Sequence, residues 1–289
     1  MKVIEIKDLR KYYGASRGVE NASFDLLEGE ILGFVGPNGA GKSTVIRMLM
    51  GLIKKTSGTV LINGMEPSAI TNAEIGYLPS EVFLYSELTV KDQLQYFADV
   101  RNSGYETIEY LADILDLDLN KKIRDLSFGN RKKVGIVAAL MHNPKIIILD
   151  EPTTGLDPLI QQRFLNLLIE YRNQGSSIIL SSHILNEVEK ICDRVALIRE
   201  GVVLFSSPLK ELRVSQYRKV KIAPANLNID IEGLTFIEND NEEDIYSFRG
   251  DINLLISGLN KYKLETIVIN ELGLEEIFMH YYQKGELND

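Results

Sequence analysis

Two segments of the chain carry residues whose types and order could do chemistry on a phosphate. The first, Gly36-Pro37-Asn38-Gly39-Ala40-Gly41-Lys42-Ser43, satisfies G-x-x-x-x-G-K-[ST] and lies between an apolar stretch and a helical pattern. Glycines let backbone N–H groups turn inward around phosphate oxygens, and the following helix directs its positive end at them. Lys42 can then reach the outer phosphates, and the Ser43 hydroxyl is placed to bind Mg²⁺. The alternative is a glycine-rich turn that merely precedes a helix, which the match of both pattern and context disfavours.

The second segment is the apolar run Ile146–Leu149, which ends in Asp150 and Glu151. A buried strand that ends in a carboxylate places Asp150 beside the phosphate loop, where it holds Mg²⁺ directly or through water. Glu151 is then positioned to orient or deprotonate an attacking water. Alone, the pattern equally describes a buried strand with acidic end residues. Together, the two segments predict a chain that binds ATP and Mg²⁺ and hydrolyses the ATP.

These segments lie in an alternating α/β pattern. Short runs at residues 31–35, 75–78, 146–149 and 178–181 read as strands, and 195–198 with 202–205 read as a hairpin around Glu200-Gly201. Pro158 opens a helix that stops near Gly175. Residues 80–143 instead carry three helical patterns, the first opened by Thr89 and Asp92 at capping-box spacing. This stretch is predicted to be a helical insertion between two α/β parts.

Beyond about residue 212 the chain becomes more polar. Residues 220–223, 236–237, 245–248 and 266–269 read as strands, while 252–259 and 274–281 read as helices. We therefore expect two domains, residues 1–212 and 213–289, of which the second is a small α+β appendix.

The order of motifs over about residues 1–210 resembles that of the ATP-binding-cassette (ABC) ATPases. Residues 126–130, Leu-Ser-Phe-Gly-Asn, stand where the family has its signature, usually L-S-G-G-Q. Residues 154–158, Thr-Gly-Leu-Asp-Pro, resemble the family's D-loop. His183, directly after the strand that ends at Ser181-Ser182, resembles the switch histidine, although a lone histidine is more often structural. Tyr13 resembles the aromatic residue that stacks on adenine, with simple packing beside Tyr12 as the alternative.

The resemblance implies a fold and a division of roles. The fold is an α/β P-loop NTPase ABC cassette, with a RecA-like core, an antiparallel β part and the helical insertion. Thr44 joins the phosphate loop in nucleotide binding. Ser127 and Gly129 contact the γ-phosphate held by another subunit's phosphate loop, which implies a nucleotide-sandwich dimer. His183 senses the γ-phosphate and acts in catalysis with Glu151.

Three positions depart from the family pattern. Phe128 and Asn130 replace a signature glycine and glutamine, and Ser80 stands where the Q-loop glutamine is expected. Ser80 can still reach Mg²⁺ through water, but its short side chain leaves the usual coupling between nucleotide and transporter open. With residues 274–278, Leu-Glu-Glu-Ile-Phe, these variants resemble bacterial exporters of the ABC-2 or bacitracin-resistance type. In those exporters the permease is a separate chain.

Composition limits the alternatives. Lys and Arg total 32 against 41 Asp and Glu, a formal charge of −9, which disfavours broad nucleic-acid binding. No run approaches the roughly 20 apolar residues of a membrane span, and the N-terminus lacks the apolar run of a signal peptide. Cys192 is the single cysteine, which fits a reducing, cytosolic location.

We therefore expect the ATP-hydrolysing motor subunit of a membrane exporter. Its expected partners are a second ABC ATPase subunit, identical or different, and separate transmembrane permease subunits. The expected location is cytoplasmic, on the inner face of the cell membrane. The alternative is a soluble ABC ATPase that acts on ribosomes or DNA. Such proteins usually carry two cassettes or a long coiled coil, whereas this chain has one phosphate loop and a short insertion.

Overall fold

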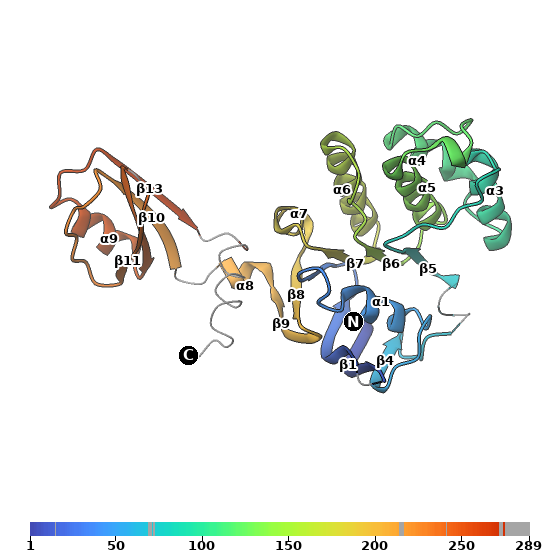
Figure 1. Cartoon of the computed structure of the whole chain (residues 1–289), viewed down its shortest axis with the longest axis horizontal. Coiled ribbons are helices and arrows are strands. Elements are labelled where there is room, and N and C mark those ends of the chain that lie inside the picture. Colours follow the sequence, from blue (N-terminus) through green and yellow to red (C-terminus); the bar gives the residue numbers. More distant parts are fainter. Residues whose placement is uncertain are drawn as a thin grey trace. The chain divides into compact units, whose positions relative to one another are not determined.

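A computed structural model of the chain describes residues 1–14, 16–68, 71, 73–213, 217–240, 242–271 and 274. The chain divides into two compact units, residues 1–208 and 209–289 (Figure 1). The expected helix at 274–281 falls almost wholly outside the described residues. Within the described part of the chain, no helix is both long and apolar enough to span a membrane.

The first unit is built on a nine-stranded sheet. The strand order is β4-β1-β2-β9-β8-β3-β7-β6-β5. The strands are β1 (Lys2–Tyr13), β2 (Ser16–Leu27), β3 (Ile31–Val35), β4 (Ser57–Ile62), β5 (Ile75–Leu78), β6 (Ile146–Asp150), β7 (Ser177–Ser182), β8 (Arg194–Arg199) and β9 (Val202–Pro208). The helices are α1 (Lys42–Leu49), α3 (Val90–Arg101), α4 (Ile108–Ile114), α5 (Phe128–Leu140), α6 (Pro158–Asn173) and α7 (Leu185–Ile191), with 3₁₀ turns at Tyr105–Thr107 and Ile123–Asp125.

The parallel part of this sheet brings the candidate residues to one edge. Every residue of β3, β6 and β7 is buried, as expected for apolar strands covered on both faces. β7 pairs in parallel with β3 and with β6, so Val35 lies opposite Ser182 and Asp150 lies opposite Ser181. Ligands of open parallel sheets bind at the carboxyl ends of the strands. The phosphate loop, Asp150 and His183 all follow these ends.

The antiparallel part joins the N-terminal strands to the end of the unit. β1 pairs with β2 and with β4, and β8 forms the expected hairpin with β9. One apolar core cluster runs from this part beneath α1 and includes Ile4, Phe24, Phe34 and Ile46, whose side chains are at most 5% exposed. Phe24 and Phe34 stack with ring centroids 4.9 Å apart. The antiparallel strands and the phosphate loop therefore share one core.

The three expected helices between residues 80 and 143 are α3, α4 and α5, which lie together in Figure 1. The Thr89 hydroxyl caps α3 by accepting a hydrogen bond from the Asp92 N–H at 3.1 Å. α5 packs closely on β5, because a Cβ on Gly76 would lie 2.4 Å from the carbonyl oxygen of Ala139. The helical region is therefore in direct contact with the parallel strands.

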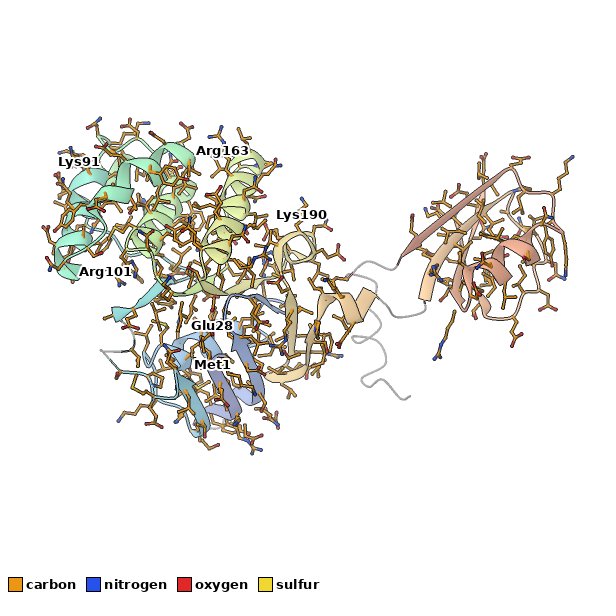
Figure 2. All side chains as sticks on the ribbon, turned by 180° about the vertical axis from the view of Figure 1, so that it is seen from behind. Met1, Glu28, Lys91, Arg101, Arg163 and Lys190 are labelled. Carbon is orange, nitrogen blue, oxygen red and sulfur yellow. The ribbon has the colours of Figure 1, made fainter. Side chains whose placement is uncertain are left out.

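His142 follows α5 and is held inside this contact. Arg101, labelled at one end of α3 in Figure 2, donates to the carbonyl oxygen of Ala73 at 3.0 Å, and its guanidinium lies 3.1 Å from His142 Nε2. Burial, together with the positive charge of Arg101, lowers the pKa of His142 to about 4. A neutral imidazole is thus a structural part of the folded protein.

The His142 environment predicts how stability depends on pH. The folded-state pKa lies below the unfolded value, so the unfolded chain takes up a proton first as pH falls from 6.5 towards 4, and stability is lost in that window. The His142→Gln variant, which has no such proton to bind, is expected to lose roughly 2–3 kcal/mol less over this range. Urea unfolding of both proteins at several pH values measures the difference. Parallel stability curves would contradict it.

The second unit is a small α+β domain. Its elements are α8 (Leu209–Arg213), β10 (Tyr217–Ala223), β11 (Leu234–Asp240), β12 (Glu243–Arg249), α9 (Ile252–Leu259) and β13 (Thr266–Glu271). The strands form an antiparallel sheet in the order β11-β12-β10-β13. Val220, Phe248 and Leu255 are at most 1% exposed and form the centre of a separate apolar core. The four expected strands and the helix at 252–259 are confirmed.

Candidate nucleotide-binding site

The glycine-rich connection between β3 and α1 has a backbone that other residues would not permit. Gly39 and Gly41 have φ angles of 80° and 106°, in the left-handed region that favours glycine. A Cβ on Gly36 would lie 2.2 Å from the carbonyl oxygen of Ile198. Gly41 caps α1 without a side-chain hydrogen bond, so the backbone N–H groups of the first turn are available to an anion. The other expected members, Pro37, Asn38, Ala40, Ser43 and Thr44, lie in the same connection or in the first turn of α1.

Lys42 is buried at the first position of α1, with 5% of its surface exposed. Its Nζ donates to the carbonyl oxygens of Gly36 at 2.6 Å and Pro37 at 3.2 Å. The same Nζ lies 3.1 Å from Oε1 of Glu151. The structure therefore brings the phosphate-loop lysine directly onto the carboxylate that follows β6.

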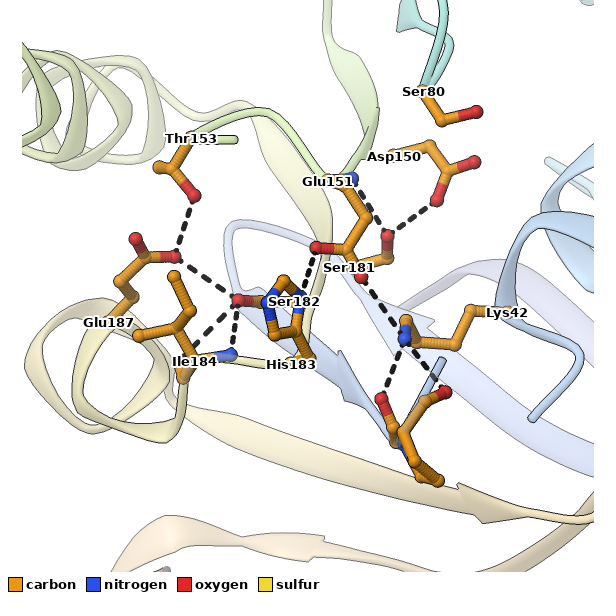
Figure 3. Close-up of polar contacts among 12 residues, drawn as sticks. Lys42, Ser80, Asp150, Glu151, Thr153, Ser181, Ser182, His183, Ile184 and Glu187 are labelled. Atoms are coloured by element: carbon orange, nitrogen blue, oxygen red, sulfur yellow. Dashed lines mark hydrogen bonds and ion pairs between the residues drawn. The ribbon is translucent and has the colours of Figure 1, made fainter. Parts of the chain in front are cut away.

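Glu151 sits between two candidate residues (Figure 3). Its Oε1 faces Lys42, while its Oε2 lies 2.7 Å from Nδ1 of His183. Because a carboxylate only accepts hydrogen bonds, the His183 Nδ1 carries the proton, which leaves Nε2 as the other functional atom of the ring. Glu151 also has φ of 49°, uncommon for a residue with a side chain. This strained backbone turns the carboxylate from the end of β6 towards the phosphate loop.

Asp150 is almost fully buried, at 1% exposed, and is held by Ser181. The Ser181 hydroxyl donates to Oδ1 of Asp150 at 2.7 Å and accepts from the Glu151 N–H at 3.0 Å. One hydroxyl on β7 thus fixes the side chain of one acidic residue and the backbone of the next. Ser80 is half-buried at the start of the loop after β5, and Figure 3 places its side chain on the Asp150 side of the cluster.

A second polar network lies behind His183. Glu187 on α7 is buried, and its Oε2 accepts from the hydroxyls of Thr153 at 3.0 Å and Ser182 at 3.2 Å. Burial raises the pKa of Glu187, with the two hydroxyl hydrogen bonds opposing the shift. The Ser182 hydroxyl also accepts from the Ile184 N–H at 2.9 Å. The segment after Glu151 and the segment that carries His183 are therefore tied to one carboxylate (Figure 3).

Ser127 and Gly129 form a separate candidate region at the start of α5. The Ser127 hydroxyl caps the helix by accepting from the Asn130 N–H at 3.3 Å, and Ser127 is exposed. A Cβ on Gly129 would lie 2.3 Å from the carbonyl oxygen of Gly155, and a Cβ on Gly155 would lie 2.5 Å from the Phe128 ring. The signature-like segment is thus packed on the D-loop-like segment. No contact described for this part of the chain joins Ser127 or Gly129 to the Lys42–Glu151–His183 cluster.

Tyr13 lies near the phosphate loop at the end of β1. Its ring is half exposed, with Lys11 Nζ 4.9 Å from the ring centroid. A Cβ on Gly18 would lie 2.9 Å from that ring, and a Cβ on Gly41 would lie 3.1 Å from the carbonyl oxygen of Gly18. Gly18 therefore lies between the Tyr13 ring and the phosphate loop, so that the aromatic ring lies beside this loop.

Comparison with known proteins agrees with this geometry. Residues 19–154 match the family described as ABC transporter. An uncharacterised ABC transporter ATP-binding protein of Methanocaldococcus jannaschii is 37% identical, over 72% of this chain and 79% of that protein. The chain belongs to the ATP-binding proteins of ABC transporters. It therefore binds nucleotide and is an ATPase.

Two further relatives of this ABC subunit are informative. The linearmycin resistance ATP-binding protein LnrL of Bacillus subtilis is 34% identical, over 70% of this chain and 68% of its own length. A solved structure described as the ATP binding subunit of an ABC transporter superposes with a TM-score of 0.68 at 32% identity, covering 73% of this chain and 92% of that one. The predicted P-loop NTPase ABC cassette fold is confirmed.

Sequence reasoning missed several residues that hold this ABC site together. These residues are Ser181, Thr153, Glu187 and, on α5, Lys132. None of them belongs to a sequence motif that indicates a chemical role. The one available signal was position, because Ser181 ends a buried strand beside Asp150 in a parallel sheet.

Proposed function

We propose that this ABC subunit is the ATP-driven motor of an exporter. Two ABC subunits close on ATP and Mg²⁺ as a nucleotide-sandwich dimer, and hydrolysis reopens them. Separate transmembrane permease subunits on the inner face of the membrane convert this motion into transport. The observation that carries the hydrolysis is the contact of Glu151 with both Lys42 and His183 beside an uncapped helix start.

The residues present fit Mg²⁺ and a nucleoside triphosphate. The left-handed glycines and the free N–H groups of α1 suit phosphate oxygens. The Ser43 hydroxyl and the Asp150 carboxylate offer the oxygen donors that Mg²⁺ prefers, with Ser80 contributing through water. When bound, Mg²⁺ neutralises charge on the β- and γ-phosphates. Tyr13 would stack on the adenine ring beside the loop.

Glu151 and His183 are assigned the chemistry of the attacking water. Glu151 orients the water and takes its proton, and its side chain is already aimed at the phosphate loop by the Lys42 contact. His183 donates its Nδ1–H to Glu151. Its Nε2 donates to a γ-phosphate oxygen when that nitrogen also carries a proton. The Glu151 carboxylate and the His183 ring would both gain a new partner when nucleotide binds.

The separation of two half-sites supports the proposed dimer. Ser127 and Gly129 present a second helix start, and Ser127 is exposed. A helix start of this kind suits the γ-phosphate held by the phosphate loop of another subunit. One subunit would thus supply Lys42, Glu151 and His183, and its partner would supply Ser127 and Gly129.

The assignment to export is supported by likeness and by one surface. The relative LnrL is described by resistance to linearmycin, a function that removal of a compound would provide. Near Ser80, Phe83 is 85% exposed and Tyr85 is 60% exposed, with Tyr96 edge-on to Tyr85 at 5.8 Å. We assign this aromatic surface to a cytoplasmic helix of the permease.

Co-purification tests the function directly. The tagged chain is isolated from membranes in mild detergent, and its partners are identified by mass spectrometry. A multi-spanning protein recovered near one-to-one is the expected result. Recovery from the soluble fraction alone, with ribosomal or DNA-associated partners, would replace the exporter by the soluble ABC ATPase and leave the ATPase activity untouched.

Ser181→Ala tests the support of the acidic pair. Without its hydroxyl, Asp150 loses a 2.7 Å hydrogen bond and the Glu151 N–H loses its acceptor. We expect ATP turnover to fall about 10-fold, the effect of one lost hydrogen bond to a charged group. Ser177→Ala is the matched control, because this buried serine lies at the other end of β7 and accepts from the Gly29 N–H. Equal turnover of both variants would contradict the prediction.

The second unit is proposed to be accessory. Lys42, Glu151 and His183 all belong to the first unit. Deletion of residues 214–289 is expected to leave turnover per dimer within a few-fold and to weaken dimer formation, measured by sedimentation over a range of concentrations. Unchanged dimer formation would rule out the dimer-stabilising role. Binding of a regulator would then be the remaining proposed role of the second unit.

A further inference from the structure

Lys132 is a buried cation that joins three segments of the chain. It lies on α5, is 2% exposed, and is among the largest fully enclosed side chains of the molecule. Its Nζ donates to the carbonyl oxygens of Ser80 at 2.9 Å, Pro79 at 3.2 Å and Asp150 at 3.4 Å. Pro79 and Ser80 follow β5, and Asp150 ends β6. One side chain therefore connects the helical region to both strand ends.

The environment of Lys132 is specific for an ammonium group. Burying a charge is unfavourable unless its hydrogens are accepted, and three carbonyl oxygens match the three N–H groups of lysine. Burial lowers the pKa of Lys132 to about 8, and the charges of Asp150 and Glu151 oppose this shift. A buried charge is weak evidence for a gain in stability. Here the ammonium group holds three carbonyl oxygens from two strand ends in one geometry.

The segments that Lys132 joins are those that would meet the nucleotide. α5 starts at Ser127, and its Gly135 is packed so closely that a Cβ there would lie 2.7 Å from the side chains of Leu78 and Val82. α5 and the residues around Ser80 thus form one packed body. The Lys132 hydrogen bond to Asp150 joins that body to β6.

We propose that Lys132 is a positioning residue that couples the start of α5 and residue 80 to Asp150. The proposal rests on the assigned roles of Ser127, Ser80 and Asp150 in the proposed function. Because Ser80 has a short side chain, the link from residue 80 to the acidic pair runs through its carbonyl oxygen and the Lys132 ammonium. A displacement of Asp150 on nucleotide binding is thereby passed to the helical region.

The test compares two adjacent lysines in the full chain, purified with its membrane partner. Lys132→Met keeps the apolar stem and removes the three donors, so turnover at saturating ATP should fall about 10- to 100-fold. The affinity for a fluorescent ATP analogue should change less than about twofold, because the phosphate loop is intact. Lys133→Met is the control, since Lys133 is 7% exposed on the same helix and donates to the Asp116 carbonyl oxygen at 3.2 Å. Wild-type turnover in Lys132→Met, or equal losses in the two variants, would overturn the proposal.

A double-mutant cycle separates positioning from simple packing. If Lys132 acts by placing the start of α5, Ser127→Ala should cost much less turnover in the Lys132→Met background than in the wild type. Full additivity of the two losses would overturn the coupling. Glu151→Gln is run in parallel. Retained turnover there contradicts the proposed function itself, whereas a loss there with additive Lys132 and Ser127 effects contradicts only the present proposal.

A third variant covers the possibility that Lys132→Met does not fold. Lys132→Gln retains two donor hydrogens on a shorter side chain and should lower turnover by about two- to fivefold, with unchanged affinity for the analogue. Thermal unfolding monitored by circular dichroism establishes which variants fold. Wild-type turnover of a folded Lys132→Gln protein, where Lys132→Met cannot be measured, would overturn the proposal.

Discussion

Replacing Glu151 with glutamine is expected to lower ATP turnover by about 10²–10⁴-fold while ATP binding is retained. The amide keeps the size of the carboxylate but cannot take a proton from the attacking water. It also removes the ion pair of Glu151 with Lys42, so that a phosphate no longer competes with a carboxylate for this cation. Affinity for ATP is therefore expected to stay equal or to rise. Steady-state phosphate release and equilibrium binding of an ATP analogue measure the two quantities.

A matched control is the same isosteric change at Glu170, an exposed residue of α6 whose Oε2 lies 3.5 Å from the Tyr110 hydroxyl. Glu170→Gln should turn over like the wild type. Unchanged turnover in Glu151→Gln would remove the catalytic role of this residue. With Mg²⁺ and ATP, the slow variant should also accumulate as the closed dimer, and light scattering after size exclusion would show a doubled mass. A monomer at saturating ATP would argue against the nucleotide sandwich.

The sequence was sufficient to predict those elements whose formation depends on residues close together in the chain. The apolar runs that became β3 and β6 are buried throughout, and each leads directly into its functional residues. Helix starts were equally readable, because Thr89, Ser127 and Asp157 each accept a hydrogen bond from the N–H group three residues on. Such signals depend on neighbours in sequence, so they need no knowledge of the tertiary fold.

The contacts that tune the site were not readable in this way. Lys132 meets the Ser80 carbonyl oxygen 52 positions away, and Ser181 meets Asp150 31 positions away. Partners so distant depend on the strand order of the sheet, which the hydrophobic pattern of one sequence does not determine. In addition, every residue has a backbone carbonyl oxygen, so the residue types do not reveal which of these oxygens accept hydrogen bonds from Lys132. The residues of the candidate cluster could thus be named from the sequence, while the contacts among them and around them required the structure.

The contact between Lys42 and Glu151 bears directly on nucleotide binding. Lys42, which should serve the phosphates, is engaged by the carboxylate that should serve the water. The two residues therefore neutralise each other until a more highly charged anion arrives. We expect ATP binding in this arrangement to release Glu151 from Lys42 and to leave it with His183, its other partner in the cluster. In this proposal, the event that fills the phosphate loop also frees Glu151 to act as the base.

Replacing Lys42 with methionine is the complementary change, and we expect it to reduce both binding and turnover. Methionine keeps an unbranched apolar stem in this buried position but cannot donate to a phosphate oxygen. Loss of a charge-assisted hydrogen bond should weaken ATP binding about 10- to 100-fold. Loss of a preorganised cation at the reacting phosphate should lower turnover at saturating ATP by about 10²–10³-fold. Lys42→Met is therefore expected to lower the affinity for ATP, whereas Glu151→Gln is expected to leave it equal or to raise it.

Arg47→Ala is the control for Lys42→Met, because Arg47 is an exposed cation in the last turn of the same helix. Its loss removes equal charge from α1 and should leave ATP affinity within about twofold, since exposed charges are screened by solvent and salt. Isothermal titration with ATP and phosphate-release assays on the three proteins give both quantities. Lys42→Met with the affinity of the wild type would show that the lysine serves only its pair with Glu151, and the phosphate-binding role of the loop would then rest on its backbone N–H groups alone.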